Sequence, residues 1–183
     1  MNAQLKAVVV PAKRRIVPSH PPSNVLVCRD RHLSYLCEYM RPDEIHQYLA
    51  LTGAKTYDYE VAARGFMNLG GMKFVVMMDD GFTPAAAGGY SETLPGVWDS
   101  WMVGSTEGWA QQWRAITKTT LWLMDGLFEL GARRLQTNAL AERTAAIEWY
   151  ERSLGLQREG TWRAMGRDGQ DVACFSRIKR EQI

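Results

Sequence analysis

The feature that most constrains this chain is a run of mostly apolar side chains spaced three and four residues apart between residues 109 and 130. The positions that share this spacing are Trp109, Trp113, Ile116, Thr120, Leu123, Leu127 and Leu130. They follow one face of an α-helix, since 3.6 residues complete each turn. Gly131 comes next and is typical of the residue that ends a helix. A long helix with one apolar face must pack on another layer, and we predict that this layer is a sheet.

Shorter strand and helix patterns fill the rest of the chain. Strands are predicted at residues 25–28, 73–80, 85–93, 97–103, 133–138, 156–163 and 172–178, and further helices at 32–39, 43–51, 58–69 and 144–154. The three consecutive strands joined by short turns indicate an antiparallel meander. The last two strands, with the turn 167–169 between them, indicate a hairpin. The order predicts an α/β (α+β) fold, with a mixed, mostly antiparallel sheet and helices on both faces.

Residues 1–23 differ in composition from the rest of the chain. They contain four of the seven prolines and the basic cluster Lys13-Arg14-Arg15. Proline removes a backbone donor and resists regular structure, so we predict an extended N-terminal arm at 1–23 and one domain at 24–183. The basic cluster either contacts a nucleic acid or a partner surface, or is solvated terminal charge.

Composition and spacing exclude several classes of protein. The 22 basic and 20 acidic residues give a net charge of +2, which is not the strongly basic balance of a dedicated nucleic-acid-binding protein. The three cysteines, Cys28, Cys37 and Cys174, show neither metal-ligand spacing nor a disulfide framework. We therefore expect no metal site and a reducing compartment. No apolar run approaches the ~18 residues of a membrane span, so no membrane span is expected.

The C-terminal third carries a motif. Residues 146–156 read AIEWYERSLGL and residues 158–160 read REG. With one inserted residue, this resembles the A-I-x-x-Y-E-K-x-G-F helix and R-x-G strand of the GNAT superfamily of acyl-CoA N-acyltransferases, and the order of elements elsewhere is similar to that family. The resemblance implies a GNAT-like acyltransferase domain. It also implies acetyl-CoA, or coenzyme A, as the donor and an amine-bearing protein or small molecule as the acceptor.

In the family, a Q/R-x-x-G-x-G/A loop at the start of the long helix holds the diphosphate of coenzyme A on its backbone amides. The best register by length is residues 112–117, QWRAIT. The cofactor-binding residues that this register implies are Gln112, Arg114, Ala115, Thr117 and Lys118. Thr117 would crowd the phosphates, whereas Arg114 and Lys118 would add charge-assisted contacts.

The loop has an alternative register, and one further position departs from the family pattern. A second register for the loop, residues 105–110 (STEGWA), keeps Gly108 and Ala110 but loses the glutamine and lengthens the helix that follows. Arg143 stands where the family commonly has an asparagine. The resemblance places Arg143 among the cofactor-binding residues, since its guanidinium can reach an anion.

The resemblance also implies catalytic residues. Tyr150 takes the place of the family's tyrosine beside the sulfur, where it would protonate the departing thiolate; the alternative is an ordinary core tyrosine. The backbone amides of Met102 and Val103, where their strand parts from its neighbour, would polarise the acyl carbonyl. Asp99, or Glu92 on the preceding strand, would accept the proton of the amine. The alternative for both carboxylates is solvated charge.

Within the superfamily, the chain most resembles small GNAT-like proteins of short-tailed double-stranded DNA phages, some of them internal virion proteins. The residues that carry this likeness are MRPDEI at 40–45, the Gly88-Gly89 strand and the Trp-rich segment before the long helix. It implies a phage-encoded acyltransferase in the host cytoplasm. The alternative is a catalytically degenerate binding protein, either a virion and DNA-ejection component or a modulator of a host enzyme.

Overall fold

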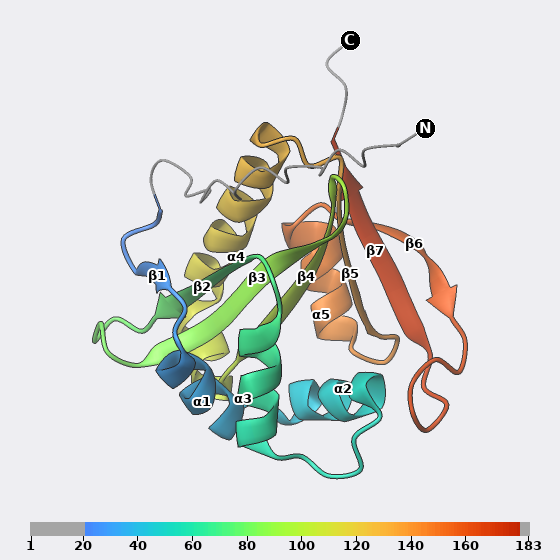
Figure 1. The fold of residues 1–183 in the computed structure, drawn as a ribbon, viewed down its shortest axis with the longest axis horizontal. Helices are drawn as coiled ribbons and strands as arrows, with labels where there is room; N and C mark the ends of the chain where they lie inside the picture. Colours follow the sequence, from blue (N-terminus) through green and yellow to red (C-terminus); the bar gives the residue numbers. More distant parts are fainter. Residues whose placement is uncertain (1–20, 180–183) are drawn as a thin grey trace, which may run out of the picture.

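The computed structural model describes residues 21–179, which form one sheet with helices around it (Figure 1). The strands are β1 Val25–Val27, β2 Met72–Met77, β3 Pro84–Leu94, β4 Val97–Gly104, β5 Arg134–Leu140, β6 Gln157–Trp162 and β7 Val172–Ile178. The helices are α1 Asp30–Glu38, α2 Pro42–Thr52, α3 Tyr59–Asn68, α4 Thr106–Glu129 and α5 Thr144–Glu148, followed by the π-helical turn η1 Trp149–Ser153. All but the last three residues of the predicted arm, 1–23, lie outside the described residues.

The sheet confirms the predicted fold class. Its strand order is β1-β2-β3-β4-β5-β7-β6. The β4–β5 pair is parallel, and every other neighbouring pair in the sheet is antiparallel. Strands β2, β3 and β4 form the predicted meander, and β6 and β7 form the predicted hairpin.

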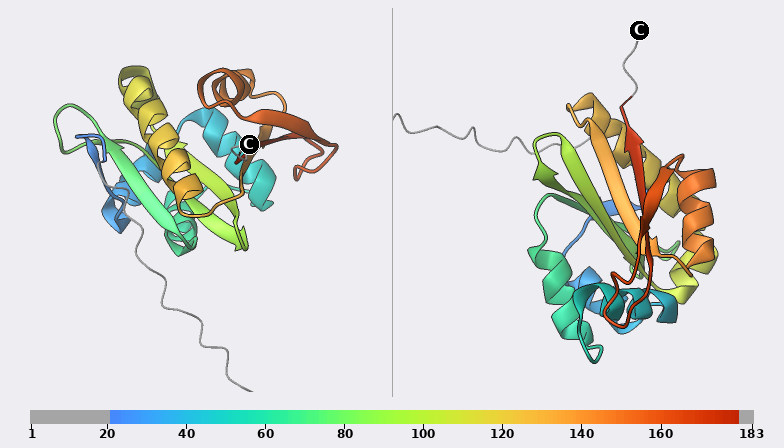
Figure 2. Two further views of the ribbon diagram at one scale, coloured as in Figure 1. Left: turned by 90° about the horizontal axis from the view of Figure 1, so that it is seen from above. Right: turned by 90° about the vertical axis from the view of Figure 1, so that its right-hand side faces the viewer.

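Helices cover both faces of the sheet, as predicted. One core cluster joins α4 and the α5–η1 segment to the sheet through residues such as Ile116, Leu127 and Phe175. A second cluster packs α1 and α3 on the opposite face, around Leu33, Leu36 and Val75. Figure 2 shows the two layers, with α2 lying across one end of the sheet. Strand alternation produces both clusters, because successive side chains of a strand point to opposite faces.

Strands β4 and β5 part before either of them ends. They pair only at Val97–Arg134, Trp98–Leu135 and Asp99–Gln136, although β4 continues to Gly104 and β5 to Leu140. Beyond these three pairs the strands leave a gap in the middle of the sheet, the β4–β5 gap. Two edges of unpaired backbone therefore face each other where the sheet would otherwise be continuous.

The inserted residue of the AIEWYERSLGL motif is accommodated by a widened helical turn. Helix α5 continues directly into η1, where the N–H of Leu154 donates to the carbonyl of Trp149 at 3.1 Å, five residues back. A π-helical turn takes up one extra residue without breaking the helix, and such turns are frequent at functional sites. Tyr150 lies inside this turn.

Candidate functional site

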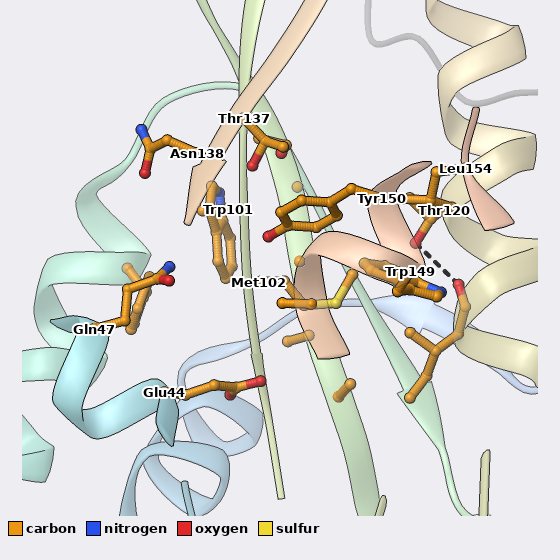
Figure 3. A pocket seen from close by; sticks show the side chains of 18 of the residues that line it. Glu44, Gln47, Trp101, Met102, Thr120, Thr137, Asn138, Trp149, Tyr150 and Leu154 are labelled. Atoms are coloured by element: carbon orange, nitrogen blue, oxygen red, sulfur yellow. Dashed lines mark hydrogen bonds between the residues drawn. The ribbon is translucent and has the colours of Figure 1, made fainter. Parts of the chain in front are cut away.

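A cavity of about 610 Å³ lies at the β4–β5 gap and is called the main cavity below. Side chains from α2, β4, β5, α4 and η1 line it. Figure 3 shows Met102 and Tyr150 pointing into the same space, while Glu44 and Gln47 project towards it from α2. The gap thus gives access to the interior from a position between two strands, where a ligand could bind to free backbone groups.

Tyr150 lies in the main cavity with its ring fixed by other aromatic rings. Its ring centroid lies 5.6 Å from that of Trp149 and 5.4 Å from that of Phe175. Burial raises the pKa of the Tyr150 phenol above its usual value, while Arg143 and the hydrogen bond with Thr137 act in the opposite direction. The phenol therefore keeps its proton at neutral pH, as a proton donor must.

Of the two backbone amides predicted to polarise a carbonyl, only that of Met102 faces the gap. The N–H of Gly104 donates away from β3, to Glu44, whereas the N–H of Ser105 donates to the carbonyl of Ala85 at the start of β3. Backbone groups alternate along a strand. The Met102 N–H therefore points into the gap, like that of Gly104, and the prediction for Val103 is wrong because its N–H points towards β3.

The two carboxylates predicted as bases do not reach the main cavity. Glu92 is exposed near the β3–β4 turn, where it accepts a hydrogen bond from the N–H of Gly96 at 2.9 Å. Asp99 lies on β4 next to Trp98, which packs on the α4 face together with Tyr150. Because side chains alternate along the strand, Asp99 lies on the opposite face from Tyr150. The structure thus separates both predicted bases from the predicted acid.

A carboxylate that the sequence analysis missed does line the main cavity. Glu44 of α2 is only 8% exposed. It accepts hydrogen bonds from the N–H of Gly104 at 2.8 Å and from the indole N–H of Trp109 at 3.1 Å. Burial raises its pKa to about 7, although the nearby guanidinium groups of Arg41 and Arg143 partly oppose that rise. A carboxylate with this pKa can gain and lose a proton near neutral pH, as a general base does.

Trp101 lines the main cavity and has a buried indole N–H donor without a partner among residues 21–179. The ring is held on Phe66, with centroids 5.1 Å apart and nearly parallel planes. Buried donors normally have a partner, so this N–H is an exception among the described residues. Solvent does not reach its nitrogen, so a ligand could accept from it only if neighbouring groups moved.

The start of α4 differs from the predicted diphosphate loop. The helix begins at Thr106, so residues 112–117 lie inside it, and most of their amides bond within the helix. The preferred register is therefore wrong as a helix start, and the second register, 105–110, coincides with the real one. There the side chain of Ser105 accepts from the N–H of Gly108 at 2.9 Å. We call residues 104–109 the β4–α4 junction.

Gly108 does not leave space for a phosphate. A Cβ at this position would lie 2.1 Å from the carbonyl oxygen of Ala85. The missing side chain therefore lets α4 approach the sheet closely. Glu44 occupies the Gly104 amide, and Glu107 adds another acidic side chain in the first turn of α4. The junction presents protein carboxylates where the diphosphate of coenzyme A would need free amides.

The residues of the preferred register have other contacts. Gln112 is buried and donates to Asp79 at 2.7 Å. Thr117 accepts from the indole N–H of Trp149 at 2.8 Å, which ties α4 to η1. The exposed Arg114 stacks on Trp113, Lys118 is exposed, and Ala115 accepts a hydrogen bond from Thr119. None of the five predicted residues of this register lines the main cavity.

Arg143 lines the main cavity but is bound to α2. Its guanidinium donates to Asp43 at 2.7 and 3.0 Å and to Gln47 at 2.8 Å, and its side chain is 9% exposed. Burial would raise the pKa of Asp43, but hydrogen bonds from Arg41 and Arg143 outweigh it and lower that pKa to about 2. Asp43 is thus the anion that Arg143 contacts in this structure.

Two absences hold for the described part of the chain. Residues 21–179 contain no group of three or more His, Cys, Asp or Glu side chains arranged to hold a metal ion. Among the helices of the same residues, none is long and apolar enough to cross a membrane.

Comparison with solved structures identifies the fold. No protein-family model matches the chain, and no curated protein sequence matches it. Solved structures do. A ribosomal-protein-alanine N-acetyltransferase from Brucella melitensis superposes with a TM-score of 0.64 at 15% identity, covering 85% of this chain and 99% of that one. The fold of this chain is therefore that of the GNAT acetyltransferases.

Two further structures agree. A GCN5-related N-acetyltransferase from Brucella melitensis gives a TM-score of 0.63 at 16% identity, over 88% of this chain and 81% of that one. The protein yncA from Salmonella typhimurium, a putative acetyltransferase whose structure contains acetyl-CoA, gives a TM-score of 0.61 at 13% identity. The match covers 86% of this chain and 94% of that one. At such identities the likeness concerns the fold.

Proposed function

We propose that this protein is an N-acyltransferase that binds the acyl-thioester arm of its donor in the β4–β5 gap and transfers the acyl group to an amine. The observation that carries the proposal is the main cavity at the parted strands, into which the Tyr150 side chain points (Figure 3). The Met102 N–H faces the same gap, because backbone groups alternate along β4.

Three groups of the chain would perform the transfer. The Met102 N–H stabilises the developing charge on the acyl oxygen. Glu44 takes the proton of the attacking amine, directly or through water, and its pKa of about 7 suits that role. As the N–C bond forms and the C–S bond breaks, Tyr150 gives its proton to the departing sulfur, and exchange with solvent restores both groups.

The diphosphate of coenzyme A does not fit the β4–α4 junction as it stands, because Glu44 and Ser105 already bind the amides of Gly104 and Gly108. The β4–β5 gap fits the thioester arm alone. The donor class we propose is therefore an acyl-pantetheine thioester recognised through its arm.

Thermal melting with acetyl-CoA and with S-acetylpantetheine tests the proposal. A ligand at 100 times its Kd adds about 2.7 kcal/mol, which is about 5–10 °C for a chain of this size. We expect acetyl-CoA and S-acetylpantetheine to raise Tm by the same amount when each is present at the same multiple of its own Kd. Because only the arm is recognised, the two Kd values should be similar. Tyr150→Phe should lower turnover about 100-fold and leave the shift unchanged; unchanged turnover would remove Tyr150 from the mechanism.

A second candidate function is a GNAT-fold binding protein that uses no acyl-CoA. The filled β4–α4 junction favours it, because two carboxylates stand where a diphosphate would bind. No change in Tm with either thioester at millimolar concentration would select this candidate. Phage origin, a virion or host-directed role and a location in the host cytoplasm stay predictions in both cases.

A further inference from the structure

A second cavity, of about 370 Å³, lies on the side of the sheet opposite α5, over β4, β5, β7 and β6. It shares lining residues with the main cavity at the point where β4 and β5 part, among them Ser100, Thr137 and Asn138. The two cavities therefore meet at the gap. A flexible ligand could occupy the second cavity and extend into the main one.

Part of the second cavity is already saturated with hydrogen bonds. Arg134 binds Glu159 through both terminal nitrogens and donates through Nε to Gln136 at 2.6 Å. Ser176 also donates to Glu159, at 2.6 Å. The hydrogen bonds from Arg134 and Ser176 lower the pKa of Glu159 to about 2. This pair is therefore ionised and internally neutral.

The other polar groups are free to bind a ligand. The side chains of Asp99, Ser100 and Asn138 form no hydrogen bond with any residue between 21 and 179. The hydrogen bonds with Glu159 raise the pKa of the Arg134 guanidinium, and Asp99 lies close enough to add to that rise, but the ion pair of Arg134 is with Glu159. Burial raises the pKa of the remaining thiol, Cys174, so it stays uncharged. The charged residues that line the cavity, Arg134, Glu159 and Asp99, thus carry one net negative charge, and the amide oxygen of Asn138 lies on the same face of the sheet as Asp99.

We propose, resting on the acyl transfer proposed above, that the second cavity binds the charged end of a diamine acceptor. An alkylammonium group is a cation with N–H donors, which match the carboxylate of Asp99 and the amide oxygen of Asn138. These two side chains share one face of the sheet, whereas Ser100, the next residue of β4, points to the face of Tyr150. The half-exposed Trp162 lines the same cavity and covers the methylene chain. An ammonium held by Asp99 keeps its charge and cannot attack a thioester, so the second, neutral amine passes through the gap towards Tyr150.

Calorimetric titration with 1,4-diaminobutane tests the site apart from any acyl transfer. We expect Asp99→Asn, which is isosteric, to weaken the Kd about tenfold, and added salt to weaken wild-type binding. Asp125→Asn is the matched control, since this exposed carboxylate lies on α4 outside both cavities; its Kd should equal that of the wild type. Equal Kd values for wild type and Asp99→Asn would overturn the proposal.

Steady-state kinetics then separate this proposal from the proposed function. With 1,4-diaminobutane as acceptor, Asp99→Asn should raise KM about tenfold and leave kcat within twofold. Butylamine, which has no second amine, should bind yet not be acylated; acylation of both amines with the same KM would refute a diamine site. Diamine binding that depends on Asp99, together with no response to either thioester, would end the acyl-transfer proposal and leave the cation site standing.

Discussion

The stretch of β4 from Asp99 to Gly104 differs at its two ends in whether its backbone edge is open or hydrogen-bonded to other parts of the protein. At Asp99 the strand separates from β5, and the sheet stays open over the next residues. At Gly104 the strand is enclosed. The N–H of Gly104 donates to Glu44, and the carbonyl of Gly104 accepts from the N–H of Arg41. An open backbone edge and a closed one thus lie within one strand.

The difference shows which parts of this fold depend on topology and which on particular residues. The gap follows from a parallel pair that stops early, and many sequences could maintain it. An anion site at a helix start requires free amides and space close to the backbone. Here Ser105, Gly108 and Glu44 use that space for packing and internal hydrogen bonds.

Removing Arg143 should have the largest effect on the free energy of unfolding, because this side chain attaches α2 to the segment before α5. Arg143→Ala leaves Asp43 with one guanidinium partner instead of two, and it leaves the side-chain oxygen of Gln47 with the N–H of Leu140 as its remaining donor. Asp43 is 43% exposed and keeps Arg41, so solvent offsets part of the loss. Charge-assisted hydrogen bonds contribute about 1.5–3 kcal/mol, and urea unfolding should show a loss near the upper end of that range, about 3 kcal/mol. Arg152→Ala, at a side chain that is 79% exposed, should change stability by less than about 0.5 kcal/mol. Equal losses in the two variants would mean that α2 is loosely attached.

Glu44→Gln separates the charge at the closed end from its hydrogen bonds. Burial raises the Glu44 pKa from 4.5 to about 7, so between these pH values the folded chain holds a proton that the unfolded chain has released. The free energy of unfolding therefore falls as pH rises through that window, by up to about 3 kcal/mol. The variant should lack this fall in urea unfolding at pH 5 and pH 8. Glu148→Gln, at an exposed carboxylate, should keep it; parallel pH profiles for Glu44→Gln and wild type would refute the assignment.

Gly108→Ala measures the space at the junction directly. The added methyl would clash with the carbonyl of Ala85, so we expect a loss of about 2 kcal/mol, as for other overpacked sites. Gly65→Ala in α3 is the matched control, because a Cβ there meets no atom within 4 Å, and it should gain up to about 1 kcal/mol in helix propensity. If both variants gain stability, the junction has room that a diphosphate could use.

Local patterns in the sequence predicted most of the fold. The helical spacing from Trp109 to Leu130 located α4, and the glycine and proline turns located the meander. The start of α4 was missed because the apolar run begins only at Trp109, whereas the cap, Ser105, lies before it. A serine followed three residues later by glycine gives a weak helix start signal, since capping boxes carry Glu or Gln there.

The site was less predictable because it depends on contacts between distant segments. Tyr150 was found through a motif around it, and the gap was expected from the same resemblance. Glu44 reads in the sequence as an acidic residue in the first turn of a helix, where charge favours it without any burial. Its role arises only when α2 packs against Gly104, sixty residues away. Strand alternation, in turn, could not show that Asp99 and Tyr150 lie on opposite faces until the pairing of β4 with β5 was known.

The widened turn at Trp149–Ser153 sets the direction of the Tyr150 ring. An α-helix rotates by about 100° per residue, so a deletion that restored ordinary pitch between Trp149 and Leu154 would turn the segments before and after it relative to each other by roughly that angle. Leu154 is buried in the core and Trp149 is tied to Thr117, so both ends resist such a rotation. The extra residue therefore works as a spacer that lets a helix anchored at two points present its phenol to the open half of the sheet.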